Sequence, residues 1–152
     1  MGEMSLQMSK KYKITIRDKH YADGEKSESE MSVFGSLTFS KDDYKISYME
    51  HDGDLAGCVT TISVSSKPDS KPDSIYMSRE GSFTTNLLLE PKRRTTCHYD
   101  TPFGSMMLGV YTYKIDSDMG QSGGNLDFAY CLDVEGSTVS ESKLHIGVSE
   151  VN

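Results

Sequence analysis

The sequence has no tryptophan, only four prolines and only three cysteines, and these shortages argue against several classes of protein. The cysteines are odd in number, lie far apart and form no Cys-x-x-Cys motif: Cys58, Cys97 and Cys131. Disulfide-stapled domains and structural zinc sites need paired or closely spaced thiols, so neither is expected here. We predict reduced thiols and a cytoplasmic protein.

Positive charge is also scarce. The chain carries 16 Lys and Arg against 23 Asp and Glu, which gives a net charge of −7. The acidic excess is concentrated in residues 18–54. The one basic run, Lys92-Arg93-Arg94, follows Pro91 and is typical of a solvated turn. Because nucleic-acid binding needs a basic stripe, we expect no nucleic-acid partner.

The chain lacks long apolar runs. No stretch approaches the roughly 18 apolar residues that a transmembrane helix needs, so we expect no membrane partner. The start of the sequence, Met1 to Lys11, is polar and lacks the apolar core of a signal peptide. We predict that residues 1–10 are a disordered or poorly ordered N-terminal segment and that residues 11–150 form one domain.

Alternation of apolar and polar residues is the dominant pattern that is present. Between Leu126 and Val134, every even position is large and apolar and every odd position is small or acidic. A period of two predicts a β-strand with one buried face and one solvated face. Cys131 then falls on the polar face of this strand.

The same pattern recurs in about ten short segments separated by turn residues, and no segment has a helical period. We therefore predict an all-β fold, a single closed antiparallel up-and-down β-barrel of about 8–10 strands, because closure removes exposed sheet edges. Gly35 interrupts one strand pattern and predicts a bulge or a sharp bend. The tandem Ser-Lys-Pro-Asp repeat at residues 66–73 predicts an elongated polar loop.

Several short motifs resemble those of the YwiB-like family, and they are spread over nearly the whole chain. In order, they are Tyr48-Met49-Glu50, Ser78-Arg79-Glu80-Gly81, Leu89-Glu90-Pro91, Tyr99-Asp100-Thr101-Pro102-Phe103-Gly104, Leu126 to Tyr130, and Leu144-His145-Ile146. The resemblance implies a bacterial, calycin-like barrel related to lipocalins and fatty-acid-binding proteins. It implies no established activity, since the family is assigned only to a domain of unknown function.

Two charged residues share the phase of inward apolar neighbours. Glu50 continues the alternation of Ile46 and Tyr48, and Arg79 continues that of Met77. Charges aimed at one interior need a partner or a ligand. One interpretation is a structural salt bridge near a barrel end. The other is that Arg79 binds the carboxylate or phosphate of a ligand, because its planar fork grips oxyanions bidentately.

Three inward tyrosines complete the candidate ligand site, because their hydroxyls can hydrogen-bond to a ligand: Tyr48, Tyr99 and Tyr130. We predict no catalytic residue, no metal site and no cofactor. His98 and Asp100 share a face that we assign to the outside of the barrel, and no nucleophile motif accompanies them. The turn at Asp52-Gly53-Asp54 lacks the distal glutamate of a calcium-binding loop.

Three functions remain open from the sequence. The first is a non-enzymatic binding protein for a small amphipathic or anionic ligand. The second is a packed-core interaction module that acts through its surface or as a homodimer, because both faces of Met106 to Ile115 look apolar. The third is an enzyme of unrecognised type, which rests on Glu50, Arg79 and His98 alone.

Overall fold

The computed structural model describes residues 11–51, 56–67, 70–81, 84–101 and 104–151. Ten strands account for nearly all of them: β1 (Lys11–Ala22), β2 (Glu25–Ser40), β3 (Asp43–Met49), β4 (Val59–Lys67), β5 (Ser70–Glu80), β6 (Thr85–Leu89), β7 (Arg94–Thr101), β8 (Gly104–Gly120), β9 (Gly123–Val134) and β10 (Ser137–Val151). Within these ranges no helix is long and apolar enough to cross a bilayer. The prediction for residues 1–10 and the turn at residues 52–54 lie outside the described residues.

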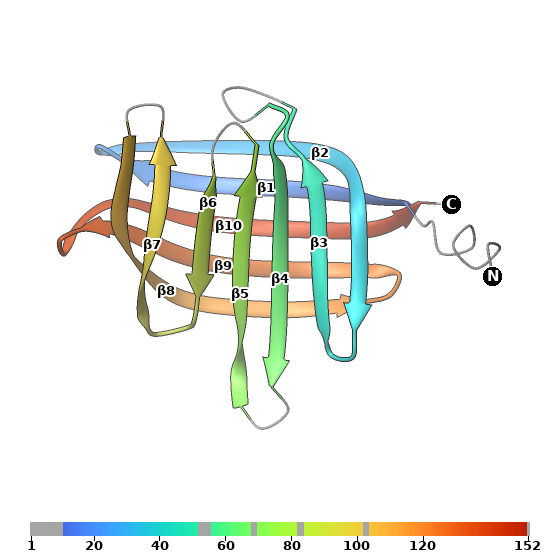
Figure 1. The fold of residues 1–152 in the computed structure, drawn as a ribbon. Coiled ribbons are helices and arrows are strands. Elements are labelled where there is room, and N and C mark those ends of the chain that lie inside the picture. The colour runs from blue at the N-terminus through green and yellow to red at the C-terminus, as the bar shows by residue number, and fades with distance from the viewer. Residues whose placement is uncertain (1–10, 52–55, 68–69, 82–83, 102–103, 152) are drawn as a thin grey trace.

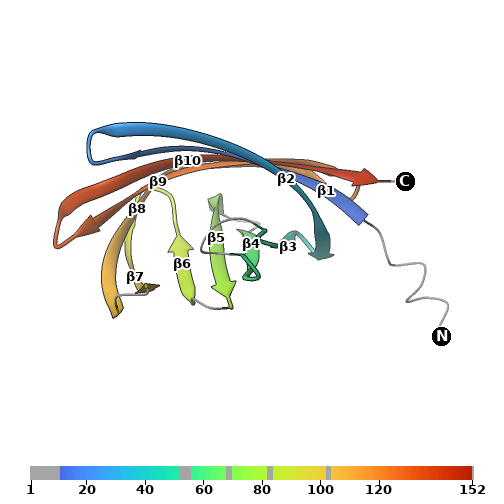
Figure 2. The same cartoon turned by 90° about the horizontal axis from the view of Figure 1, so that it is seen from above.

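The strands form one closed antiparallel barrel. Every strand pairs with its neighbours in sequence, and β1 also pairs with β10 over its whole length to complete the circuit. The predicted all-β, up-and-down barrel is confirmed. Five long strands, β8, β9, β10, β1 and β2, make one layer, and β3 to β7 run crosswise to them in a second layer (Figures 1 and 2).

The two layers are joined where β2 bends from one into the other (Figure 1). Gly35 lies at this bend, since it pairs with Tyr12 of β1 and also with Tyr48 of β3. A Cβ at this position would overlap the carbonyl oxygen of Ser47 and a methyl group of Ile14. The bend predicted at Gly35 is therefore present, and it exists because only glycine lets the two chains approach so closely.

β8 contains a β-bulge. It changes the pattern predicted for Met106 to Ile115, where both faces of the strand looked apolar. The pairing with β9 shifts between Thr112 and Lys114, so one extra residue reverses the alternation. Ile115, which strict alternation would place on the face opposite Val110, is consequently buried in the core with Val110. The sequence carries no mark of this bulge, because Tyr113 fits either face of a strand.

The predicted loop at residues 66–73 was also wrong. β4 continues to Lys67 and β5 begins at Ser70, and these two residues face each other in the ladder. The hairpin simply extends beyond the body of the barrel (Figure 1). Proline in the repeat suggested a break, but a strand tolerates proline where its missing N–H is not needed by the ladder.

Inward side chains of both layers fill the barrel with a single apolar cluster. Those that are essentially inaccessible to solvent are Ile14, Ile46, Ile62, Val64, Ile75, Leu89, Val110, Leu126, Phe128 and Ile146. They are large, mostly β-branched residues at alternate positions, as a buried sheet face requires. This cluster supplies the apolar burial that stabilises the fold, and it lies beside a polar region described next.

Candidate functional site

The candidate site consists of two rows of inward polar residues, one in each layer. The first row crosses five consecutive strands of the second layer. Its members oppose one another in the ladder: Tyr48, Thr60, Arg79, Thr85 and Tyr99. Opposed residues of an antiparallel pair project from the same face of the sheet. The row one step further along these strands is apolar and includes Ile46, Ile62, Met77 and Leu87.

Glu50 and Arg79 meet at this first row, as the sequence predicted. A guanidinium nitrogen of Arg79, Nη2, lies 3.6 Å from Oε2 of Glu50. Thr60 links them: Arg79 Nε donates to Thr60 Oγ1 at 3.2 Å, and Thr60 Oγ1 donates to Glu50 Oε2 at 2.7 Å. The predicted contact is confirmed. The bridging hydroxyl of Thr60 was missed, because cross-strand register cannot be read from one sequence.

Tyr48 lies beside this ion pair and is buried. Burial raises the pKa of Tyr48 well above its usual range, and the charge of Glu50 raises it further. The charge of Arg79 and a hydrogen bond with Thr60 oppose this rise. The phenol is consequently neutral at physiological pH, and its hydroxyl can serve as a hydrogen-bond donor.

The second row crosses four strands of the first layer. Its opposed members are His20 of β1, Ser142 of β10, Tyr130 of β9 and Thr112 of β8. His20 Nδ1 and Ser142 Oγ are 2.9 Å apart, and Ser142 also hydrogen-bonds to Tyr130. A second hydrogen-bonded chain thus runs along the inner face of the barrel.

The two rows meet at Tyr130. Burial raises the pKa of Tyr130 to about 12, and the charge of Asp18 adds to the rise. Tyr99 also raises it, whereas Ser142 and the charge of Arg79 lower it. Tyr130 therefore lies within electrostatic reach of both layers. The structure brings together all five residues that the sequence predicted for the site, namely Glu50, Arg79, Tyr48, Tyr99 and Tyr130.

We call this region the polar end of the barrel and define it as the two polar rows together with Asp18 and Glu50. Solvent reaches the polar end. The side chain of Arg79 is 18% exposed, in contrast to the inaccessible apolar cluster. Apart from its contacts with Thr60 and Glu50, the guanidinium makes no hydrogen bond to another described residue. Arginine has five N–H donors, so the group retains free capacity for an oxyanion.

Asp18 also belongs to the polar end, although the sequence analysis did not select it. It continues the alternation of the buried residues Ile14 and Ile16, so its carboxylate projects inward. That alternation was the signal that could have revealed it. No ion pair joins Asp18 to His20 among the described residues, so Asp18, His20 and Ser142 do not assemble an acyl-transfer triad.

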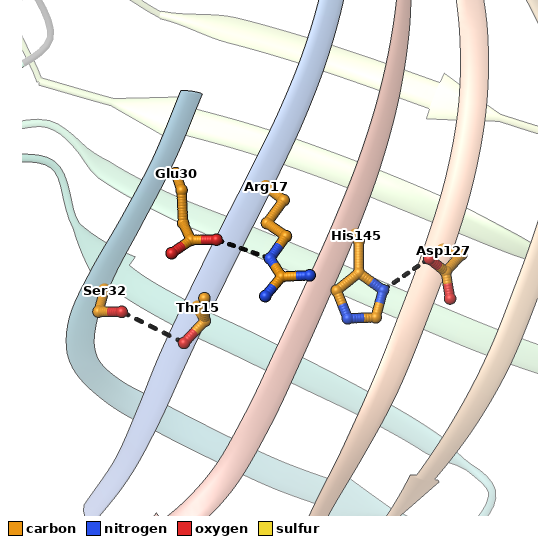
Figure 3. Close-up of polar contacts among 6 residues, drawn as sticks. All are labelled: Thr15, Arg17, Glu30, Ser32, Asp127 and His145. Atoms are coloured by element: carbon orange, nitrogen blue, oxygen red, sulfur yellow. Dashed lines mark hydrogen bonds and ion pairs between the residues drawn. The ribbon is translucent and has the colours of Figure 1, made fainter. Parts of the chain in front are cut away.

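The outer face carries polar pairs of a different kind. His98 Nε2 lies 3.6 Å from Asp100 Oδ1, and both side chains are exposed, which confirms their predicted place outside the barrel. Figure 3 shows two more outer pairs, Arg17 with Glu30 at 2.6 Å and His145 with Asp127 at 2.7 Å. Exposed pairs of this type contribute little to stability and bind nothing by themselves.

Comparison with known proteins agrees with this fold. The chain is similar to the YwiB protein from Bacillus subtilis, whose crystal structure superposes with a TM-score of 0.79 at 20% identity over 94% of this chain and 93% of that one. No curated protein matches the chain. The model of a family described as a domain of unknown function, DUF1934, matches residues 14–146. Since the match covers most of the sequence, the chain belongs to the DUF1934 family.

Proposed function

We propose that the protein is a non-enzymatic binding protein that holds a small anionic ligand at the polar end of its barrel. The observation that carries this proposal is the position of Arg79, whose guanidinium projects from the inner face of β5 and retains donors that no described residue uses. Arginine in a partly desolvated setting binds carboxylates and phosphates through two parallel hydrogen bonds. Tyr48 and Tyr99, in the same row, supply hydroxyl groups for the same ligand.

The geometry of the Glu50–Arg79 pair favours this function over a purely structural salt bridge. Charge-assisted N–H···O bonds in well-formed pairs are about 2.7–2.9 Å long, and bidentate ones use two such bonds. The contact between Arg79 and Glu50 is a single approach at 3.6 Å. Glu50 instead takes its short bond from Thr60. An incoming oxyanion can therefore engage the guanidinium without breaking the hydrogen bond of Glu50.

The ligand would bind at one end of the barrel and not in a hollow centre. The apolar row next to Arg79 consists of buried side chains, including Ile46, Ile62 and Leu87. A small barrel whose interior is filled by close-packed side chains leaves no room for a guest molecule at its centre. The alkyl part of an amphipathic ligand would thus lie over partly exposed inward residues such as Leu144 and Met31.

A thermal-shift series with inorganic phosphate and straight-chain carboxylates tests the proposal. A ligand at 100 times its Kd stabilises the folded state by about 2.7 kcal/mol, which corresponds to a rise in Tm of roughly 5–10 °C for a chain of this length. We expect this shift in the wild type and in the control Arg17→Met, which removes an exposed outer-face arginine. Arg79→Met should abolish it. Equal shifts in Arg79→Met and the wild type, or no shift with any anion, would contradict the proposal.

A second candidate function is association through the outer surface. Met107 and Tyr113 of β8 are 60% and 43% exposed, although they are large apolar or aromatic residues. Met107 opposes His98, an exposed residue of the outer face. Large apolar side chains exposed on an outer face favour a protein contact. Sedimentation over a range of concentrations tests this function: a homodimer should dissociate on dilution, and Met107→Glu should weaken it, whereas a monomer at every concentration would exclude it.

A further inference from the structure

Asp18 has a carboxylate oxygen that the protein buries without satisfying it. Its Oδ1 atom is inaccessible to solvent and has no hydrogen-bond partner among the residues that the structure describes. More than nine in ten buried polar groups in proteins have such a partner, because an unsatisfied one lowers stability. An oxygen that the protein leaves unsatisfied is a place for a water molecule, an ion or a ligand group.

A second unsatisfied atom lies in the same region. Thr112 is fully buried, and its Oγ1 hydrogen-bonds to none of the described residues. Thr112 opposes Tyr130 in the ladder between β8 and β9, and the pKa of Tyr130 responds to the charge of Asp18. The two unsatisfied oxygens therefore flank Tyr130 on the inner face of the first layer. The carboxylate oxygen of Asp18 accepts hydrogen bonds, and the hydroxyl of Thr112 can accept as well as donate, so a group that donates hydrogen bonds would satisfy both.

The charge of the polar end also favours a ligand that donates hydrogen bonds. Asp18 and Glu50 are two carboxylates, whereas the basic groups of the polar end are the guanidinium of Arg79 and the imidazole of His20, which carries a positive charge only when it is protonated. A simple anion that approaches Arg79 therefore meets a surplus of negative charge from the protein. A ligand that carries a cationic group as well would neutralise this surplus and would place opposite charges against both layers.

We infer that the ligand of the polar end is a zwitterion, with an anionic group bound by Arg79 and an ammonium or similar N–H donor bound by Asp18. This inference rests on the proposed function, and it names the chemical class of the ligand. Asp18 accepts a charge-assisted hydrogen bond from the cationic group, and Thr112 offers a further acceptor beside Tyr130. Tyr130 opposes Thr112 on the same inner face, and the charges of both Asp18 and Arg79 act on its hydroxyl.

Matched ligands that differ by one charged group test this inference on the full-length chain. The probes are straight-chain ω-amino acids of increasing length, the carboxylates that lack the amine, and the alkylamines that lack the carboxylate. Binding is followed by NMR chemical-shift titration. We expect at least one ω-amino acid to bind the wild type about tenfold more tightly than its matched carboxylate and amine, which corresponds to about 1.4 kcal/mol for the added contact.

Two variants test whether the preference for the ω-amino acid depends on Asp18. Asp18→Asn keeps the shape of the side chain and should reduce the affinity for the ω-amino acid to that of the carboxylate, while the affinity for the carboxylate stays the same or improves. The control Asp127→Asn removes a carboxylate from the outer face (Figure 3) and should change neither affinity. Circular dichroism establishes that each variant is folded.

The outcomes separate this inference from the proposed function. If carboxylates and ω-amino acids bind equally well and both are lost in Arg79→Met, the proposed function stands and the zwitterion inference is overturned. If Asp18→Asn leaves the preference for the ω-amino acid intact, the inference is overturned as well. If the wild type binds none of the three classes, the proposed function fails, and this inference fails with it.

Discussion

The two ends of the barrel interior share one architecture and differ in almost every other respect. Along β3, β4 and β5, the residues Ile46, Ile62 and Met77 form an apolar row that is shielded from solvent. One step further along the same strands, Tyr48, Thr60 and Arg79 form a polar row. Because inward positions recur every two residues, a step of two residues in each strand separates the core from the candidate site.

This comparison shows how a small barrel can carry both stability and a polar site. The apolar rows bury surface that contributes about 25 cal/mol for each square ångström removed from water. The polar end includes two buried oxygens without a hydrogen-bond partner among the described residues and a distorted ion pair, which lower stability. The apolar end therefore offsets the cost of the polar end, and the loss of a core side chain should destabilise the protein most.

The largest expected effect is at the apolar end. Phe128 is essentially inaccessible and is among the largest of the fully buried side chains. Phe128→Ala should reduce the free energy of unfolding by roughly 3–5 kcal/mol, because it removes apolar burial and leaves a cavity. Urea denaturation followed by circular dichroism measures this change.

Ser142 of β10 provides the substitution to compare with Phe128→Ala. It opposes Tyr130, which is the next inward residue of β9 after Phe128. Ser142→Ala removes one hydroxyl from the second polar row and should cost about 1 kcal/mol, the usual net value of a hydrogen bond. If Ser142→Ala destabilised the protein as much as Phe128→Ala, the division of the interior into a stabilising end and a polar end would be wrong.

The second prediction concerns the ion pair. Arg79→Met should cost roughly 2–4 kcal/mol, because it leaves the buried carboxylate of Glu50 without its cation. The double variant Glu50→Leu with Arg79→Met should recover much of that loss, since an apolar pair of similar volume is often as stable as a buried ion pair. Equilibrium unfolding of the two single variants and the double variant gives the coupling energy.

Two results would separate structural and binding roles at this pair. A stable double variant that no longer responds to anions assigns Arg79 to ligand binding. An unstable double variant would show instead that the polar row holds β3 and β5 in register. If Arg79→Met changed neither the stability nor the response to ligand, Arg79 would have neither a structural nor a binding role.

The third prediction tests the bend that lets the two layers face each other. Gly35→Ala should cost about 1–3 kcal/mol, because the added Cβ meets a backbone carbonyl that cannot easily move. Gly147→Ala is the matched control, since its Cβ would lie at an ordinary contact distance of 3.8 Å from Nε2 of His145. The control should stay within about 0.5 kcal/mol of the wild type in the same unfolding assay.

Most of the fold was predictable from the sequence, because a period of two fixes which face of each strand is buried. Alternation placed Tyr48, Glu50 and Arg79 on the inner face correctly, and the contact of Glu50 with Arg79 followed from it. Alternation failed at Ile115, where a bulge inserts one residue. A bulge depends on how two strands pair, and a single sequence does not contain that information.

The composition of the candidate site was predictable only in part, for the same reason. The face on which a side chain lies follows from the alternation within its own strand. The residues that lie beside it depend on how neighbouring strands are paired, which is the register. Thr60 was missed because nothing within β4 shows that it opposes Arg79. Ser142 was missed because it is small and polar, a residue type that is normally exposed in a strand.

The smallest expected effect is that of Asp18 on the pH dependence of stability. Its sign is more informative than its size. Burial raises the pKa of Asp18 above its ordinary value of 3.8, and the charge of His20 opposes the rise. The folded state thus binds this proton more tightly than the unfolded state, and stability is lost as the pH rises through the pKa of the folded state. At neutral pH the ionised carboxylate destabilises the fold, so Asp18→Asn should be more stable than the wild type there.

A carboxylate on the outer face should behave in the opposite way. Asp133 accepts two hydrogen bonds from Arg94, at 2.6 and 3.0 Å, and one from the backbone N–H of Gly136. Arg94 and this N–H hold the pKa of Asp133 below 3.8, so its stabilising effect is present above that value and is lost as the pH falls through the pKa of the folded state. Asp133→Asn should therefore be less stable than the wild type at neutral pH.

Unfolding free energies of both variants, measured relative to the wild type as the pH is lowered, test the pair of predictions together. The gain from Asp18→Asn should shrink as the pH falls through the pKa of the folded state toward 3.8, where the unfolded state becomes protonated as well. The loss from Asp133→Asn should shrink as the pH falls from 3.8 through the lower pKa of the folded state. A loss of stability in Asp18→Asn at neutral pH would show that its carboxylate is satisfied within the protein. In that case the contrast between a stabilising end and a polar end kept for a ligand would not hold at Asp18.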